Sequence, residues 1–456
     1  MKKWKVLFFF IIITAIALRF FRIPQNLVFH GELGDNYLAI KNFWENGQIP
    51  LMGPPTSHPW LSFGPLFYWL FEPILILSNF NPVGMAYFIA ATQVLLVIVN
   101  FFVIKKLFNK KIALISSYLI AISPSFINLT RESRFFSLTT LFFYPFLYYL
   151  VKLKLFLAGL FFGIMLNFHL TPIVLLPGIA IYLFKKKVAP KQILRGILGF
   201  VIPNMPFLIY SFEHKFSMML NFLSWIPYRV AGFAGLYPKN NFSLDVLKKN
   251  LVSLFDFVGF NFVPSFKIIV GVGILLILLF SLYRLYKVKT KDRIKKNPAF
   301  SLLILFFVFS YLGIFIHGDP PSHYYLPIFS LPLIFVAIIL EKSRKVAFFI
   351  LLLLTIINLS FFFSDKWFYL PQDKVIDGRS PYIEQLETAK NIIKDSKGEK
   401  FSLRRVGAFD YFEGNYAQNY KYLLWWLGNE PQDASKVTYT IYEKEGESVY
   451  FSRSSD

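Results

Sequence analysis

The 456-residue sequence contains no cysteine, and only 16% of its residues are charged. Without thiols the chain can form no disulfide, no thiolate metal site and no cysteine nucleophile. Hydrophobic residues make up 55% and aromatic residues 20%, whereas soluble domains are about 45–50% apolar and about 25% charged. Such a chain cannot cover a water-facing surface with polar groups, so we expect a lipid bilayer to be its solvent.

Acidic residues are also scarce, and they are distributed unevenly. The chain has 26 Asp and Glu against 48 Lys and Arg, for a net charge of +22. Residues 365–456 carry 13 basic and 15 acidic residues, so the whole basic excess lies in residues 1–364. A basic excess confined to an apolar region is typical of the cytoplasmic loops of membrane proteins. We therefore expect membrane lipids and no nucleic acid as partners.

Eleven apolar runs predict about eleven transmembrane helices, although the fifth and sixth are short and could be bent or half-inserted at Pro172 and Pro177. They cover roughly residues 4–23, 83–104, 112–128, 135–151, 155–169, 172–184, 194–211, 266–283, 298–316, 323–340 and 346–363. Of the 35 Lys and Arg in residues 1–364, 24 fall on the side assigned to the cytoplasm, where Asp292 and Glu341 are the only acids. This charge bias predicts a multi-pass protein of the cell membrane, with a cytoplasmic N-terminus and an extracytoplasmic C-terminal end.

Two long segments on the predicted outer face, 24–82 and 212–265, interrupt the series of apolar runs. Within the first, residues 37–46 and 65–77 have helical patterns, and tryptophans accompany them at the depth where aromatic rings anchor in the membrane interface. We expect helices that lie in the interface. The alternative, a true crossing at 65–80, would invert every later loop and break the charge pattern.

The composition changes sharply after residue 364. Ser380 and Pro381 are typical of a helix start, and apolar side chains recur at helical spacing behind them. Alternating runs at 437–442 and 448–451 favour strands. We expect a transmembrane domain over 1–364 and a small α/β extracytoplasmic domain over 365–456.

Two carboxylates, Glu32 and Asp35, directly follow the first apolar run. A charge at the edge of the hydrocarbon is costly unless it faces water or a partner, so Asp35 is a candidate functional group. Asp is also a favoured N-cap, and the alternative is that Asp35 caps a helix over 37–46. The pair could divide acid and base roles or share a divalent metal, or Glu32 could belong to a solvated turn. No cofactor is definite, and a divalent metal is the only candidate.

A second polar cluster, Arg131, Glu132 and Arg134, follows the third apolar run. Arginine presents a planar fork of donors that matches phosphate, and Glu132 would hold the geometry. The alternative is that both arginines extend toward lipid headgroups.

Histidines mark two further outer turns. His317, Asp319 and His323 lie between the ninth and tenth runs, followed by Tyr324, and His169 ends the fifth run. Two histidines and an aspartate could suggest zinc, but a fourth ligand is not visible in the sequence. We favour hydrogen bonds from His323 and Tyr324 to a polar substrate. Polar groups in spans usually face the interior, so His169 is either a substrate contact or a structural histidine.

An aspartate just beyond the first helix, in a long outer loop, resembles the GT-C glycosyltransferases. More narrowly, the chain is similar to the branch of protein O-mannosyltransferases and bacterial lipid A aminoarabinose transferases. Gly34-Asp35-Asn36-Tyr37 resembles the family's pattern of an acid followed by tyrosine, which adds Tyr37 to the candidate substrate contacts. Residues 50–56, 64–68 and 323–327 resemble segments of bacterial members.

The resemblance implies a glycosyltransferase that uses a polyprenyl-phosphate sugar as donor and a lipid, glycan or protein hydroxyl as acceptor. It implies that Asp35 is the catalytic base and that Glu132 is the nearest candidate for a second catalytic acid. Relatives have an aspartate three residues after an arginine in that region, and here Ser137 follows Arg134. Alternatives are a transporter or flippase for polyprenyl-linked glycans, which should contain repeats that we do not find, and a surface-polysaccharide ligase.

Overall fold

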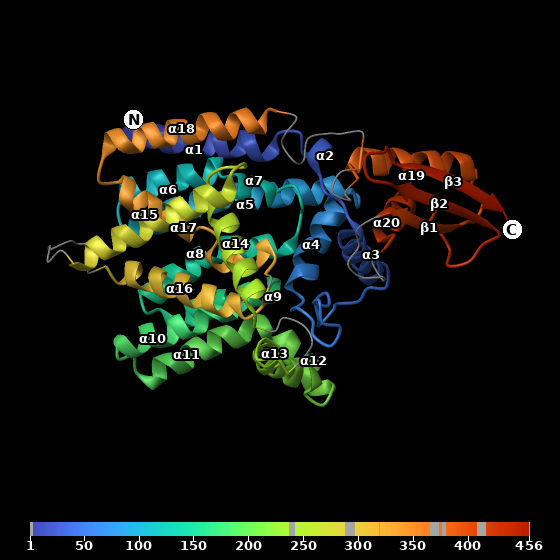
Figure 1. Ribbon diagram of the computed structural model, residues 1–456. Coiled ribbons are helices and arrows are strands. Elements are labelled where there is room, and N and C mark those ends of the chain that lie inside the picture. Colours follow the sequence, from blue (N-terminus) through green and yellow to red (C-terminus); the bar gives the residue numbers. More distant parts are fainter. Residues whose placement is uncertain are drawn as a thin grey trace.

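The computed structural model describes residues 3–236, 242–287, 297–318, 320–364, 374–375, 380–407 and 416–455. Most of the chain is a body of packed helices, and the C-terminal residues form a small α/β unit beside one end of that body (Figure 1). A mostly helical chain with a small C-terminal α/β unit is therefore confirmed. The boundary expected at residue 365 lies outside the described residues and stays a prediction.

Every apolar run of the sequence is helical. The helices of the body are α1 (Lys3–Phe20), α5 (Pro82–Leu107), α6 (Lys110–Ile122), α7 (Pro124–Asn128), α8 (Leu138–Val151), α9 (Leu155–Phe168), α10 (Leu176–Lys185), α11 (Pro190–Val201), α12 (Met205–Glu213), α15 (Lys267–Lys287), α16 (Pro298–Phe315), α17 (Leu331–Leu340) and α18 (Arg344–Phe362). Short 3₁₀ helices join or precede some of them: η1 (Phe135–Ser137), η2 (Thr171–Leu175), η3 (Ile202–Asn204) and η4 (Ser322–Ile328).

Prolines divide several of the runs into two pieces, because proline cannot continue the hydrogen-bond ladder of a helix. Pro124 starts α7 directly after α6, and η4 and α17 meet at an angle of 53°. By length and composition, four helical stretches in the described ranges can cross a membrane, or five if this bent pair is one crossing. They are Pro82–Leu107, Pro190–Glu213, Pro298–Phe315 and Arg344–Phe362. The number of eleven crossings therefore stays a prediction.

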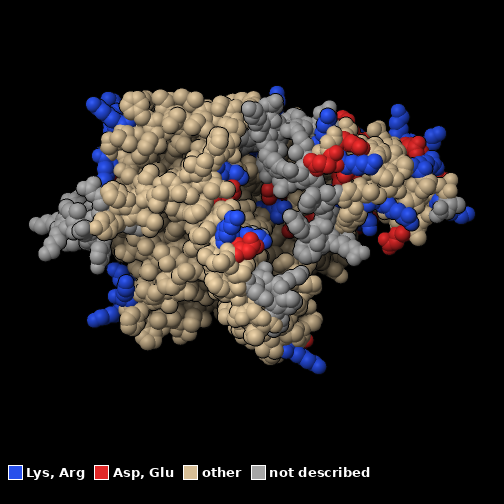
Figure 2. Space-filling model, viewed as in Figure 1, with Lys and Arg blue, Asp and Glu red and all other residues tan. Residues whose placement is uncertain are grey.

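The outer surface of the body is apolar. Phe9, Phe348 and Phe349 expose 60%, 61% and 66% of their surface, which a water-soluble fold would not tolerate on so large an area. On the face shown in Figure 2, a broad uncharged surface covers the helices, and Lys and Arg gather at the end away from the C-terminal unit. These features fit a membrane location, while the orientation of the two termini stays a prediction.

Where the structure describes them, the long outer segments contain five helices: α2 (Ile23–Asn26), α3 (Gly31–Glu45), α4 (Leu66–Leu77), α13 (Ser217–Phe233) and α14 (Leu244–Phe260). Helix α3 begins at Gly31 with His30 as its N-cap. Asp35 thus lies in the second turn of α3, and the alternative that it caps a helix over 37–46 is wrong. The reason is that His30, in an extended conformation, provides the helix start six residues earlier than the apolar pattern suggests.

The C-terminal unit contains a three-stranded sheet in the order β1-β2-β3. Its elements are α19 (Tyr382–Ser396), β1 (Ser402–Gly407), α20 (Gln418–Trp426), β2 (Val437–Glu443) and β3 (Tyr450–Ser455). Strand β1 is parallel to β2, and β3 is antiparallel to it. The two strands expected from alternation are confirmed. Strand β1 was not expected because it contains a charged side chain on its buried face: Arg405, whose Nε donates to buried Glu443 at 2.6 Å.

The C-terminal unit packs on α3 through α20. A Cβ atom at Gly34 would lie 2.3 Å from the backbone nitrogen of Asn419, so only glycine allows the two helices to approach this closely. Asn419 donates to Gln385 on α19 (2.8 Å), and Gln385 donates to the carbonyl of Phe29 just before α3 (2.8 Å). Lys41, in the same helix as Asp35, pairs with Glu430 at 3.2 Å. The C-terminal unit therefore packs closely on α3 and helps to hold it in place.

Candidate functional site

Asp35 is half-buried on α3. Within the described residues its carboxylate has no hydrogen bond and no ion pair. Burial is the main cause that raises the pKa of Asp35, and the negative charge of Glu32 raises it further, whereas the positive charge of Lys421 on α20 opposes the shift. Tyr68 of α4 lies close enough for the negative charge of Asp35 to act on its hydroxyl group. A carboxylate without a partner and with a raised pKa has the properties of a proton acceptor.

Arg134 joins the two other predicted carboxylates. Its Nη1 lies 3.7 Å from Glu32 Oε2, and its Nε lies 3.1 Å from Glu132 Oε2. The guanidinium carbon also lies over the ring of Phe136, 5.4 Å from the centroid. The fold therefore brings Glu32, Glu132 and Arg134 together from segments about 100 residues apart, and the arginine is already balanced by two acids.

The predicted histidines form an aromatic cluster beside Arg134. The ring of His323 stacks on Phe136, with centroids 4.9 Å apart, and lies edge-on to His169 at 5.5 Å. Tyr324 contacts His169 at 5.5 Å and His317 at 4.7 Å. His169, His323 and Tyr324, which are far apart in the sequence, thus share one region with Arg134.

His169 is buried and has a local partner as well. Its Nδ1 lies 2.8 Å from the hydroxyl of Thr171, two residues further along the chain. This contact fixes the ring where α9 ends and η2 begins. A structural role and a contact to substrate through the other ring nitrogen are compatible at this position.

Arg131 lies in a different place from the one predicted. It is buried, and its guanidinium donates to the carbonyls of Leu18, Arg19 and Phe21 at the C-terminal end of α1. The last carbonyls of a helix lack partners within the helix, and a cation there satisfies them and complements the helix dipole. We therefore assign Arg131 to the fold, as the cap of α1, instead of to a phosphate site.

Arg19, in the last turn of α1, caps the neighbouring helix α6 in the same way. It is buried and donates to the carbonyls of Ile120 and Ala121 at the end of α6, at 2.9 Å each. The end of α6 is thus capped by Arg19 of α1, and the end of α1 is capped by Arg131, which follows α7. In the sequence these arginines look like any others of the outer face, because their targets are backbone atoms about 100 residues away.

Tyr37 also departs from its predicted role. Its side chain has no exposed surface, and its ring packs against Phe29 (5.8 Å) and against Tyr422 of α20 (5.6 Å). Asp35 and Tyr37 are two residues apart, so they point to different sides of α3. Tyr37 therefore belongs to the contact with the C-terminal unit and does not reach the substrate side.

Arg229 on α13 is a candidate that the sequence analysis missed. Its Nε is buried and unbonded, and the side chain forms no hydrogen bond or ion pair with any described residue. Its charge acts on His58, whose pKa is lowered by burial first and by Arg229 second. Arg229 also acts on Tyr324 of the aromatic cluster. Its isolation as the only charge in the apolar stretch 217–233 is the sequence signal that could have indicated it.

The metal suggested by His317, Asp319 and His323 gains no support from the geometry. Asp319 lies outside the described residues. Across the described part of the chain, His, Asp and Glu form no group of three or more that could hold an ion. We therefore derive no chemical step through a metal, and the divalent metal stays a sequence-level prediction.

Comparison with known proteins supports the same fold. The model of the dolichyl-phosphate-mannose-protein mannosyltransferase family matches residues 57–210. No curated protein matches the chain. The structure of ArnT from Cupriavidus metallidurans bound to undecaprenyl phosphate superposes with a TM-score of 0.62 at 9% identity, covering 97% of this chain and 93% of ArnT.

Structures of the oligosaccharyltransferase AglB from Archaeoglobus fulgidus are similar over a smaller share of their length. The complex with zinc and sulfate has a TM-score of 0.52 at 13% identity and covers 93% of this chain and 62% of that one. The complex with an inhibitory peptide and a dolichol-phosphate also has a TM-score of 0.52 at 13% identity, with coverages of 93% and 64%. This chain thus spans less than two thirds of the archaeal enzyme.

The shared fold and the matched segment agree with the residues that first suggested the resemblance. ArnT and AglB are both GT-C glycosyltransferases, and the superposition on ArnT extends over nearly the whole of both chains. This protein therefore has the GT-C fold, and its resemblance to the protein mannosyltransferase and aminoarabinose transferase branch of those membrane enzymes is confirmed.

Proposed function

We propose that this protein transfers a sugar, a hexose or a pentose, from a polyprenyl-phosphate donor to an acceptor hydroxyl at the outer face of the membrane. The observation that carries the proposal is Asp35, a carboxylate without a partner on a helix held in place by the C-terminal unit. A paired acid–arginine cluster and the unpaired Arg229 lie in the same region. Relatives of this fold hold undecaprenyl phosphate or dolichol-phosphate in their structures.

Asp35 is the proposed base. Its carboxylate takes the proton of the acceptor hydroxyl while the hydroxyl oxygen attacks the anomeric carbon of the donor. The bond between that carbon and the phosphate oxygen breaks, and its electron pair leaves with the polyprenyl phosphate. Phosphate is a good leaving group, so a strong general acid is not needed. A direct displacement of this kind inverts the anomeric configuration.

Arg229 is the proposed ligand of the donor phosphate. A phosphate gains most from a cation that is not already neutralised, and a guanidinium in a partly buried place gives short, charge-assisted hydrogen bonds. Arg134 is balanced by Glu32 and Glu132, so we assign it to the wall of the site, with His323 and Tyr324 as its polar neighbours. Glu132, predicted as a second catalytic acid, is better suited to holding Arg134 than to accepting a proton.

The lipid that the protein retains tests this function. We would purify the wild type and Asp35→Asn from native membranes into nanodiscs and identify bound lipids by mass spectrometry. The variant should keep an intact polyprenyl-phosphate sugar, because it can bind the donor but cannot activate the acceptor. The wild type should also contain polyprenyl phosphate. Only bulk phospholipid in both samples would contradict the donor class.

A transport assay separates the proposal from a flippase. Proteoliposomes loaded with a polyprenyl-phosphate hexose should release polyprenyl phosphate when an acceptor is added. Movement of the intact lipid between leaflets, without cleavage of the sugar–phosphate bond, would instead favour the transporter alternative.

A further inference from the structure

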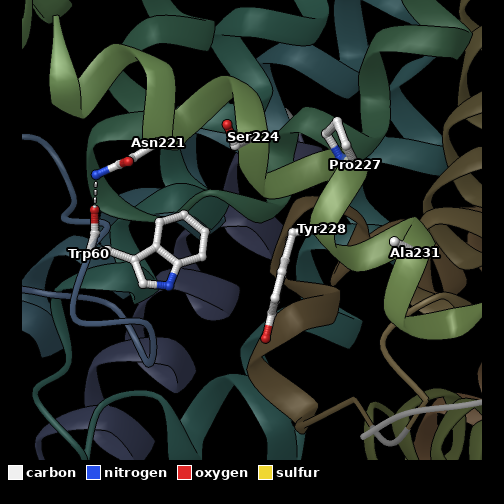
Figure 3. A pocket seen from close by; sticks show the side chains of 6 residues that line it. All are labelled: Trp60, Asn221, Ser224, Pro227, Tyr228 and Ala231. Atoms are coloured by element: carbon white, nitrogen blue, oxygen red, sulfur yellow. Dashed lines mark hydrogen bonds between the residues drawn. The ribbon is translucent and has the colours of Figure 1, made fainter. Parts of the chain in front are cut away.

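A cleft of about 410 Å³ opens between α13 and the segment before α4. Figure 3 shows the ring of Trp60 on one side and that of Tyr228 on the other, with α13 forming the roof. All of its lining residues are uncharged: Trp60, Asn221, Ser224, Pro227, Tyr228 and Ala231. A cleft with aromatic walls and a few hydrogen-bonding groups is the usual chemistry of a small-molecule site.

The aromatic wall is held in place from behind. His58 stacks on Trp60 with centroids 5.2 Å apart, and the rings of Trp60 and Tyr228 meet edge to face at 5.7 Å. Asn221 donates one amide hydrogen to the backbone carbonyl of Trp60 at 2.6 Å, as the dashed line in Figure 3 marks. This bond leaves the side chain of Asn221 a second donor and a carbonyl acceptor for a ligand. The Trp60 side chain is positioned but still 36% exposed.

Helix α13 presents two different stripes along its length. Asn221, Ser224 and Tyr228 follow helical spacing on the side of the cleft. Leu223 and Val230 belong to a neighbouring stripe of exposed apolar side chains. A helix with one apolar and one polar stripe lies in the plane of the membrane interface. Such a position would suit a cleft that faces lipid headgroups.

The cleft lies on the same helix as Arg229, the proposed ligand of the donor phosphate. Arg229 follows Tyr228 on α13, and its charge acts both on His58 behind the aromatic wall and on Tyr324 of the aromatic cluster. Arg229 thus links the helix that lines the cleft to the aromatic cluster of the candidate site. The lining carries no charge, so a neutral group fits it better than a phosphate or an acidic peptide.

We propose that this cleft binds the neutral sugar headgroup of a glycolipid acceptor, with a sugar ring stacked on Trp60 and its hydroxyls bonded to Asn221 and Ser224. The aromatic face, the amide and hydroxyl groups, the lack of charge and the two stripes of α13 all suit such a ligand. The inference rests on the proposed function and adds the class of its acceptor.

Native mass spectrometry of the full chain in nanodiscs tests the inference. The probe is dihexosyl diacylglycerol, compared with diacylglycerol, which lacks the sugar, and with phosphatidylglycerol. The wild type should retain the dihexosyl lipid in preference to both others. Trp60→Ala should weaken that retention about tenfold, which is the scale of one lost aromatic contact. Ser224→Leu, which fills the cleft without removing a wall, should weaken it as well.

Trp44→Ala is the matched control. Trp44 is also an exposed tryptophan of the outer segments, at 50%, but it lies at the end of α3 and outside the cleft lining. This variant should bind the dihexosyl lipid as the wild type does. Retention of the dihexosyl lipid at the wild-type level by both Trp60→Ala and Ser224→Leu would overturn the inference. A preference of the wild type for diacylglycerol or phosphatidylglycerol would overturn it too.

Binding of polyprenyl phosphate, measured in the same samples, separates this inference from the proposed function. If wild type and Trp60→Ala both bind polyprenyl phosphate, the variants are folded and the donor site is intact. A wild type that binds polyprenyl phosphate but shows no preference for the dihexosyl lipid then contradicts only the acceptor class. Failure of the wild type to bind polyprenyl phosphate contradicts the proposed function itself.

Discussion

The two helices that carry the main proposed residues, α3 and α13, are held in very different ways. Seven residues of α3 are buried, and α20 packs on it so closely that Gly34 has no room for a side chain. In α13 only Gly232 is buried. Catalysis requires the base within about 0.5 Å of its productive position, whereas a binding surface tolerates more freedom. We infer that α3 is the rigid side of the site and α13 the adaptable one.

The largest expected effect lies on the rigid side, at Asp35. Asp35→Asn keeps the size of the side chain but removes the base, so the transfer rate should fall by about 10²–10⁴-fold while donor binding persists. Single-turnover transfer in nanodiscs measures it, and Asp245→Asn serves as the control because Asp245 is exposed in the first turn of α14 and paired with Lys249 at 3.2 Å. Near-normal transfer by Asp35→Asn would return the role of base to one of the other carboxylates.

Replacing Arg229 and replacing Arg131 should have opposite effects on donor affinity and on thermal stability. Arg229→Ala removes an unpaired cation on α13, so donor affinity should fall about 10- to 100-fold, the scale of about 1.5–3 kcal/mol for a hydrogen bond to a charged group. Thermal stability should stay close to that of the wild type. Microscale thermophoresis with polyprenyl phosphate and a thermal melt measure the two quantities.

Arg131→Ala should show the reverse pattern. It leaves the buried carbonyls at the end of α1 without donors, at a cost of about 1–3 kcal/mol for each unsatisfied group. The melting temperature should drop, and the remaining folded protein should bind donor normally. If Arg131→Ala instead lost donor affinity at unchanged stability, the assignment of Arg131 as a helix cap would be wrong.

The close contact between α3 and α20 can be tested at Gly34. Gly34→Ala places a methyl group 2.3 Å from the backbone of Asn419, so α20 must move and the position of Asp35 changes with it. We expect transfer to fall several-fold at unchanged donor affinity. Gly273→Ala on α15 is the matched control, because a Cβ at Gly273 meets no atom within 4 Å. Equal activity of both variants would show that α3 does not depend on the C-terminal unit.

The smallest expected effect is a shift of the pH profile. Asp35 must be ionised to accept a proton, and its raised pKa places the acidic limb of the transfer rate at higher pH than for an ordinary aspartate. Glu32→Gln removes a negative charge, lowers the pKa of Asp35 and should move the limb to lower pH. Lys421→Gln removes a positive charge and should move it to higher pH. Shifts in the same direction for both variants would contradict this electrostatic arrangement.

Patterns along the chain were sufficient for the secondary structure of most of the molecule. Apolar runs, separated by loops rich in Lys and Arg, located every helix of the body. A helix that crosses a lipid bilayer needs a long apolar run, and such a run is visible in the local sequence. Alternation located β2 and β3. Strand β1 was missed because Arg405, which reads as a surface residue, is buried against Glu443. The helix start at His30 was missed because histidine is not among the residues favoured at an N-cap.

The candidate site was predicted only in part, and the reason lies in the range of the interactions. Asp35 and Glu32 are three residues apart, so their proximity on one helix face follows from the sequence. Whether an arginine binds phosphate depends on what else occupies its guanidinium. Arg131 is engaged by the end of α1, Arg134 is balanced by two acids, and Arg229 has neither kind of partner.

By itself the sequence determined that this protein is a helical membrane protein, that it ends in a small α/β unit, and that a carboxylate follows its first helix. Composition and period decide these features, because solvent and backbone geometry act on each segment alone. Only the tertiary structure decided that Tyr37 faces the C-terminal unit, that Arg131 caps α1 and that Arg229 stays available. Those roles depend on partners about 100 or more residues away, which no local pattern contains.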